Sequence, residues 1–173
     1  PNNNDLVFTD GTNDIPFSIE LIFYLDDANR SVFLINKRRD NSSSEYQINY
    51  NGTKLIFRLF SQSPSNNIIS IIFQNANLQS NQTYHLVATY DGTKYSSGLS
   101  MFLQGVSVGD TTFQDLTYQG QVDTGSDLVI GQSEAFNSFA FDGKMQILNI
   151  VKGHKYTAGE VSNLYDNGNY TLY

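Results

Sequence analysis

Hydrophobic and polar residues alternate along most of the chain with a period of two. In the segment 16–25, PFSIELIFYL, one face carries Phe17, Ile19, Leu21 and Phe23, and the intervening positions fall on the other face. This alternation is typical of strands with one side in a hydrophobic core. We therefore expect a strand here, with these four side chains inside.

The segment 45–60, EYQINYNGTKLIFRLF, predicts a β-hairpin. Two alternating runs flank Asn51-Gly52, a dipeptide that suits the positive φ angles of a type I′ turn. Counting outward from this turn gives a core face with the pairs Tyr50–Thr53, Ile48–Leu55 and Tyr46–Phe57. The outward face has the pairs Asn49–Lys54, Gln47–Ile56 and Glu45–Arg58, and we expect the last to be an exposed ion pair.

Similar runs predict strands along the rest of the chain, and polar turns such as Asp91-Gly92 separate them. The runs are 68–73, 84–90, 99–108 with a turn at Gln104-Gly105, 127–131 and 143–151. A single helix is expected from Thr157, which begins a capping-box spacing, to about Gly168. The sequence thus predicts one all-β domain over residues 1–173, a two-sheet antiparallel β-sandwich with one short C-terminal helix.

Composition narrows the range of partners. The 173 residues include 11 Tyr and 12 Phe, which indicates a packed core, and the net charge of −7 repels nucleic acid and anionic membranes. There is no cysteine, so disulfide bonds and thiolate metal sites are excluded. No apolar run approaches the roughly 18 to 20 residues of a membrane helix, so we expect no membrane insertion.

The order of the predicted elements resembles the concanavalin A-like, laminin-G-like jelly-roll family. The resemblance extends from Asp5 to about Gly168. It rests on the fragments DLVFTDGTNDIPFSIELIF, TYHLVATYDGT, LSMFLQGVSV, DLVIGQ, FDGKMQILNI and TAGEVSNLYDNG. The family includes lectins, adhesion modules, glycoside-active enzymes and structural domains, so the resemblance implies the fold and leaves the function open.

Candidate catalytic residues are scarce. Glycoside hydrolysis needs two carboxylates across a cleft, and the glucanase branch that the chain resembles carries them on one strand as E-x-D-x-E, a motif that this sequence lacks. The adjacent Asp26 and Asp27 are interpreted as a turn. Neither His85 nor His154 has a ligand or relay partner at a suitable spacing, and no G-x-S-x-G motif marks a nucleophile.

Calcium is the one cofactor that the resemblance implies, because many sandwich domains of this family bind it at the rim. Asp10-Gly11 and Asp142-Gly143 resemble positions that supply such a site, through the oxygen ligands that calcium prefers. An ion shared by these two turns would join segments far apart in the sequence. The alternative is that both are plain Asp-Gly turns.

Sugar binding needs an aromatic face and directed polar groups in a groove. The outward face of the hairpin offers Gln47, Asn49, Ile56, Arg58 and Phe60, and the predicted loop Lys37-Arg38-Arg39-Asp40 adds donors. Phe102 is expected on the face of its strand opposite to the core residues Leu99, Met101 and Leu103. The alternative is that these residues pack under a neighbouring loop or lie singly on the surface.

Three functional classes follow. The leading hypothesis is a non-catalytic lectin-like module of an extracellular or virion-surface protein that binds glycans. The second is a structural or adhesion domain of a capsid, tail fibre or filament, which contacts a surface protein within a larger assembly. The third is a glycoside-active enzyme with an unfamiliar site. The missing carboxylate motif favours the first two.

Overall fold

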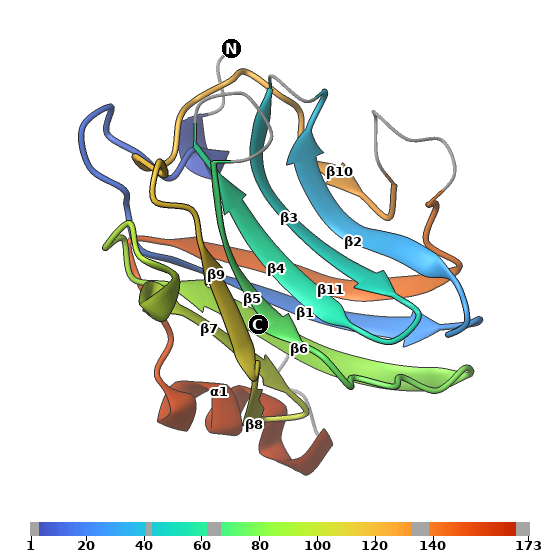
Figure 1. Ribbon diagram of the computed structural model, residues 1–173. Coiled ribbons are helices and arrows are strands. Elements are labelled where there is room, and N and C mark those ends of the chain that lie inside the picture. The colour runs from blue at the N-terminus through green and yellow to red at the C-terminus, as the bar shows by residue number, and fades with distance from the viewer. Residues whose placement is uncertain (1–3, 41–42, 62–66, 133–138, 169–173) are drawn as a thin grey trace.

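The computed structural model describes residues 4–40, 43–61, 67–132 and 139–168 and confirms a β-sandwich of two antiparallel sheets (Figure 1). The five-stranded sheet has the order β11 (Gly143–Lys152), β1 (Phe17–Leu25), β6 (Gln82–Tyr90), β7 (Leu99–Leu103) and β8 (Val106–Val108). The six-stranded sheet has the order β10 (Val129–Ile130), β2 (Ser31–Arg38), β3 (Ser44–Asn51), β4 (Leu55–Phe60), β5 (Ile68–Phe73) and β9 (Thr111–Gln114).

The inner faces of the two sheets form the core. Phe17, Ile19, Leu21 and Phe23 of β1 are fully buried, as expected from their alternation. Phe17 stacks on Phe8 with a centroid distance of 3.8 Å and meets the edge of Phe57 from the opposite sheet. The first strand therefore joins the N-terminal segment and both sheets in one aromatic cluster.

The hairpin β3–β4 forms with the predicted faces but with a shifted register. Tyr50 pairs with Leu55 and Ile48 with Phe57, because the two turn residues are Gly52 and Thr53 rather than Asn51 and Gly52. The Asn51 side chain causes the shift, since its Oδ1 accepts hydrogen bonds from the backbone N–H groups of Thr53 and Lys54. A turn moved by one residue changes every partner by two, so inner residues stay inside.

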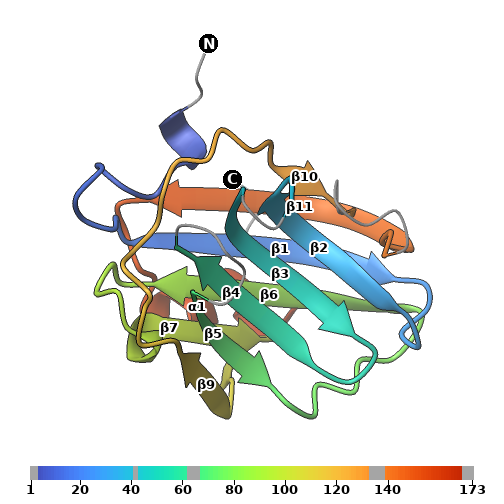
Figure 2. The ribbon, with the colours of Figure 1, turned by 45° about the horizontal axis from the view of Figure 1, so that its top comes forward.

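The outer surface of the five-stranded sheet is covered by the C-terminal segment. The helix α1 (Ala158–Tyr165) begins at Thr157 with the predicted capping box and lies on the side away from the six-stranded sheet (Figure 2). Ser18 of β1 donates a hydrogen bond to the carbonyl of His154 and accepts one from the N–H of Tyr156. Consequently the second face of β1 is buried as well. On the outer face of the six-stranded sheet, Gln47 and Ile56 were predicted to be exposed but are buried, and Asn49 and Arg58 are partly exposed.

Three short 3₁₀ helices complete the described structure: η1 (Asn4–Leu6), η2 (Ser96–Gly98) and η3 (Asp166–Gly168). Among the described residues, no helix is long and apolar enough to cross a membrane. Strands β2 and β9 were not anticipated from the sequence. The apolar run at the start of β2 ends in Lys37 and Arg38. In the sequence alone, these two charged residues together with Arg39 and Asp40 resemble a loop.

Candidate functional site

The outer face of β3 and β4 carries four of the predicted ligand residues. Asn49 and Gln47 lie on β3, and Arg58 and Phe60 lie on β4. The Oδ1 atom of Asn49 accepts hydrogen bonds from Gln47 Nε2 at 3.3 Å and from Arg58 Nη1 at 3.5 Å. The structure thus brings Gln47, Asn49 and Arg58 into one polar group, in which Gln47 is buried and the other two are partly exposed.

Arg38 joins this group from β2. Its guanidinium carbon lies 5.4 Å from the centroid of the Phe60 ring, which is a cation–π contact. The Phe60 side chain is buried. Arg39, the next residue, is exposed and lies 3.8 Å from Asp40 as a surface ion pair. The predicted loop from Lys37 to Asp40 is therefore wrong in its first half, because Lys37 and Arg38 belong to a strand that pairs with β3.

The predicted Glu45–Arg58 pair is also wrong. With the shifted register Arg58 lies opposite Gln47, and Glu45 is fully buried. The Glu45 carboxylate forms an ion pair with Lys37 and accepts hydrogen bonds from the N–H and hydroxyl groups of Thr124. This outward position is closed because residues 121–126 pack over the end of the hairpin.

A small recess of about 170 Å³ opens beside Asn49 on the same sheet face. Phe33 of β2 and Phe139 form its aromatic wall, with an edge-to-face contact at 5.8 Å between ring centroids. The backbone N–H of Phe33 donates to the carbonyl of Phe139, which fixes Phe139 against β2. The recess therefore combines an aromatic wall with the amide of Asn49.

Phe102 does not belong to this surface. It lies on β7 of the other sheet and is buried in a separate cluster with Val87 and Val161. Val161 is the first apolar position of α1 that faces the sheet, so the helix covers the site where Phe102 would meet a ligand. The prediction of a ligand contact at Phe102 is wrong for this reason.

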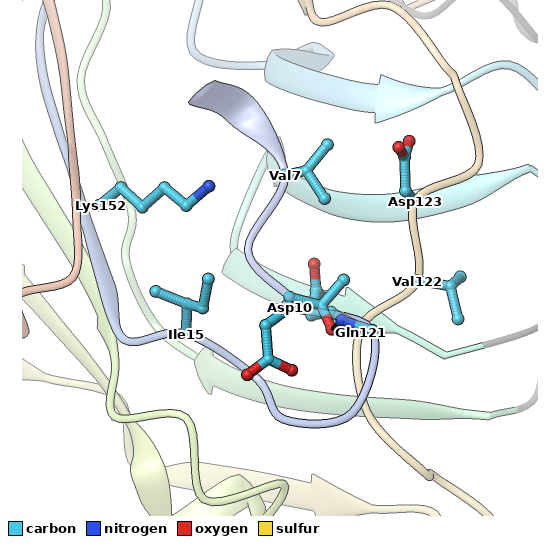
Figure 3. Close-up of a pocket in the computed structure, with 9 residues that line it drawn as sticks. Val7, Asp10, Ile15, Gln121, Val122, Asp123 and Lys152 are labelled. Atoms are coloured by element: carbon cyan, nitrogen blue, oxygen red, sulfur yellow. Dashed lines mark hydrogen bonds between the residues drawn. The ribbon is translucent and has the colours of Figure 1, made fainter. Parts of the chain in front are cut away.

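A larger pocket of about 540 Å³ lies at the rim of the sandwich (Figure 3). Val7, Thr9, Asp10, Gly11 and Ile15 line it from the N-terminal segment, and Gln121, Val122 and Asp123 line it from the segment between β9 and β10. Lys152, the last residue of β11, extends into the same region (Figure 3). Three segments far apart in the sequence thus contribute to this pocket.

The two carboxylates of the rim pocket are each fixed by their own turn. Asp10 Oδ1 accepts hydrogen bonds from the N–H groups of Thr12 and Asn13, and these bonds, that of Asn13 first, lower the pKa of the Asp10 carboxyl. Asp123 Oδ1 accepts in the same way from the N–H of Gly125. Each carboxylate keeps its second oxygen for other partners.

The buried end of the pocket is held by a polar network. The N–H of Gln121 donates to Asp14 Oδ1 at 2.7 Å, and Gln121 Nε2 donates to the carbonyl of Glu45 at 2.9 Å. Tyr90 donates its hydroxyl hydrogen to Asp14 Oδ2. These bonds fix the Gln121–Asp123 wall relative to both sheets, so the pocket is a preformed feature. Gln121 and Asp123 were not identified from the sequence, because no motif or spacing in it connects them to Asp10 or Lys152.

The two turns proposed for calcium lie at opposite ends of the five-stranded sheet. Asp10 precedes the start of β1 in the chain. Asp142 lies beside the other end of β1, because its neighbour Gly143 pairs with Leu25, the last residue of that strand. The nine residues of β1 span about 26 Å, so a single ion shared by the two turns does not fit. Asp142 forms an exposed ion pair with Arg30, and a side chain at Gly143 would overlap the carbonyl of Tyr24. Residue 143 must therefore be glycine, because the backbone of Tyr24 leaves no room for a side chain.

Both histidines contact glutamates. His85 Nε2 lies 3.0 Å from Glu20 Oε1, and both side chains are buried. His154 Nε2 lies 2.8 Å from Glu160 Oε1 near the start of α1. Neither histidine lines the rim pocket or the recess. Within the described residues, no group of three or more His, Asp or Glu side chains has an arrangement that would hold a metal ion.

The two stacked antiparallel sheets define a jelly-roll β-sandwich. The chain belongs to the concanavalin A-like lectin/glucanases superfamily, whose family model matches residues 2–162. Comparison with curated protein sequences finds no match.

Solved structures share the fold at low sequence identity. The botulinum neurotoxin type G receptor binding domain superposes with a TM-score of 0.60 at 16% identity, and the match covers 89% of this chain and 38% of that one. The receptor binding domain of the mosaic serotype C/D toxin gives 0.65 at 14% identity, covering 96% and 38%. A heptameric SAP-like pentraxin from Limulus polyphemus gives 0.62 at 16% identity, covering 90% and 73%. The chain spans little more than a third of the toxin chains.

Proposed function

We propose that the protein is a non-catalytic recognition module that binds glycans at the rim pocket, as part of an extracellular or virion-surface protein. The observation that carries this proposal is the pocket itself, which is large enough for one or two sugar rings. Asp10 and Asp123 offer carboxylate oxygens to sugar hydroxyl groups, Lys152 offers a donor, and Val7, Ile15 and Val122 provide apolar walls.

The superfamily contains both binding and glucanase members, and three observations favour binding. The E-x-D-x-E motif is absent from the sequence. The carboxylates of the rim pocket are each tied to their own turn, and the pKa of Asp10 is lowered, whereas a general acid in glycoside hydrolysis needs a raised pKa. The similar solved structures include toxin domains described as receptor-binding.

A glycan array with the purified domain tests the proposal. We expect a defined set of glycans to bind and Asp123→Ala to weaken that binding about tenfold or more, because a charged hydrogen bond contributes about 1.5–3 kcal/mol. Asp115→Ala is the matched control, since Asp115 caps a similar turn through Thr117 outside the pocket. Absence of any glycan binding, or equal binding by Asp123→Ala and the wild type, would contradict the proposal.

Catalysis is tested separately. Incubation with β-glucans, alginate and chitin between about pH 5 and 8, a range that covers the usual pKa values of catalytic acids, should release no product. Product release that a single carboxylate substitution abolishes would show instead that the chain is a glycosidase.

A second candidate function, protein contact as an adhesion or structural domain, is favoured by exposed apolar side chains near the β9 edge. Leu116 is 97% exposed, Tyr95 63% and Phe113 47%. They flank Gln114 and Ser96, which are joined by a hydrogen bond from the Ser96 N–H to Gln114 Oε1. Clustered exposed apolar residues often mark protein interfaces. A negative glycan array together with self-association in sedimentation experiments would favour this function.

A further inference from the structure

Two arginines face the same side of the six-stranded sheet in a protein of net charge −7. Arg38 comes from the end of β2 and Arg58 from the middle of β4, and both are partly buried. This positive surface lies outside the rim pocket, whose charged lining residues are Asp10, Asp123 and Lys152. It therefore calls for a separate explanation.

Arg58 has little to compensate its charge. A guanidinium carries five N–H donors, and the one hydrogen bond described for Arg58 is the 3.5 Å contact with Asn49. Among the described residues, no carboxylate lies within 4.0 Å of its nitrogen atoms, although the chain has seven more acidic than basic residues. Charged groups withdrawn from water are ordinarily paired, so an uncompensated guanidinium has a strong tendency to attract an anion.

The neighbouring positive charge increases this tendency. Burial, and after it the charge of Arg38, lowers the pKa of the Arg58 guanidinium, although arginine stays protonated in the physiological range. Arg38 is held near Arg58 by its position over the Phe60 ring. The fold thus fixes two like charges close together. Asp40, whose carbonyl accepts a hydrogen bond from Arg38 Nε at 3.3 Å, offsets part of the charge of Arg38, whereas within the described residues no carboxylate does so for Arg58.

The surroundings indicate which kind of anion fits. Asn49, the hydrogen-bond partner of Arg58, also lines the 170 Å³ recess with the aromatic wall of Phe33 and Phe139. A sugar ring can pack against an aromatic wall while an amide meets its hydroxyl groups. Long polyanions such as nucleic acid are disfavoured by the net charge of −7, whereas a single planar carboxylate matches the fork geometry of arginine.

We propose that Arg58 and Arg38 bind the carboxylate of a uronic acid residue, whose ring packs in the recess formed by Phe33, Asn49 and Phe139. This inference goes beyond the proposed function, because it assigns a second site on the sheet face with its own chemistry. It does not require the rim pocket to bind the same sugar.

The probes are methyl β-D-glucuronide and methyl β-D-glucoside, which differ in the carboxylate alone. Calorimetry and amide chemical-shift mapping by NMR should show binding of the glucuronide, with shifts centred on Asn49 and Arg58, and much weaker binding of the glucoside. Arg58→Gln should weaken glucuronide binding about tenfold or more, since it removes a charge-assisted bidentate contact. The glucuronide affinity of Arg58→Lys should lie between those of the wild type and Arg58→Gln, because an ammonium group keeps the charge but cannot form the bidentate contact.

Lys144→Gln is the matched control for loss of one positive charge, since Lys144 is exposed and lies on β11 of the other sheet. It should leave glucuronide binding unchanged. Arg38→Gln provides a second test of the same site if Arg58→Gln does not fold. Equal binding of glucuronide and glucoside, or unchanged glucuronide binding in both arginine variants, would overturn the inference.

The rim variant separates this inference from the proposed function. Asp123→Ala should leave glucuronide binding unchanged while it weakens the glycans identified on the array. If Asp123→Ala abolishes glucuronide binding and Arg58→Gln does not, the carboxylate is bound at the rim, and the sheet-face site is wrong although the domain still binds glycans.

Discussion

At the scale of single residues, the Lys37–Glu45 ion pair shows how a polar outward position becomes part of the interior. The side chain of Glu45 is fully buried and that of Lys37 is 5% exposed. Glu45 also accepts two hydrogen bonds from Thr124, whereas its Oε2 atom is buried with no hydrogen-bond partner in the described structure. A carboxylate in this position depends on Lys37 for charge compensation.

We expect Lys37→Met to lower the free energy of unfolding by about 3–5 kcal/mol, because it leaves a buried carboxylate without its counter-charge. Urea unfolding at neutral pH measures this. Lys144→Met, at an exposed lysine, is the control and should change stability by less than about 0.5 kcal/mol. The double variant K37M/E45M should recover part of the loss, and a double variant less stable than Lys37→Met would contradict the account.

The contribution of the apolar core to stability can be tested at Phe57. Its side chain is fully buried and meets Phe17 edge to face across the two sheets. Phe57→Ala should lower the free energy of unfolding by about 3–5 kcal/mol. Phe113→Ala, which removes the same atoms from a half-exposed position on β9, should cost much less. Similar losses in thermal or urea unfolding would mean that Phe57 does not occupy a well-packed site.

At the scale of elements, the start of α1 contains a titratable cap. Glu160 accepts hydrogen bonds from the backbone N–H and the hydroxyl of Thr157, and it also contacts His154. These interactions, the backbone bond first, lower the pKa of Glu160 from 4.5 to about 2. Because the folded-state pKa is the lower one, the ionised carboxylate stabilises the fold above about pH 4.5, and this contribution is lost as the pH falls towards 2.

Thr157→Ala should raise the pKa of Glu160 towards its ordinary value, since the hydroxyl donor is removed. NMR titration of the Glu160 carboxyl group measures the shift. The same change should lower the free energy of unfolding by about 1 kcal/mol through the lost N-cap. Thr157→Ser keeps the hydroxyl and should restore both values. An unchanged Glu160 pKa in Thr157→Ala would show that the hydroxyl has no part in the cap.

At the scale of the whole molecule, stability depends on strand pairs that join distant parts of the chain. Phe17 of β1 pairs with Lys152 of β11 on one side and with Tyr90 of β6 on the other. Central strands of this kind open only when the sheet opens, whereas edge strands open locally. The edge strand β9 has three exposed residues of four.

Native-state hydrogen exchange should therefore be slowest for the paired backbone amides of β1 and β3 and fastest, among the strands, for β9 and β10. Exchange monitored by NMR or mass spectrometry gives the order. The Lys37→Met variant should accelerate exchange in β2 and β3 more than in β1, because the ion pair lies on those two strands. Equal protection of β1 and β9 would contradict the sheet order.

Local sequence patterns determined the strand faces, the hairpin and the cap of α1. Alternation identifies the apolar face of a strand because successive side chains point to opposite sides, and Tyr46, Ile48, Leu55 and Phe57 are all buried as predicted. The capping box at Thr157 is likewise a short-range signal, read from four consecutive residues. Even the wrong hairpin register kept the faces, since a shift of two residues preserves the alternation.

Only the tertiary structure decided which outward positions stay open to solvent. Alternation places both Glu45 and Phe102 on the outer faces of their sheets, yet residues 121–126 contact the first and α1 covers the second. The rim pocket joins Asp10, Asp123 and Lys152, which no spacing rule connects, and the same fold separates Asp10 from Asp142. Alternation tells two faces of a strand apart, but what lies on each face depends on segments that arrive from elsewhere in the chain, and that packing is not encoded in any local pattern.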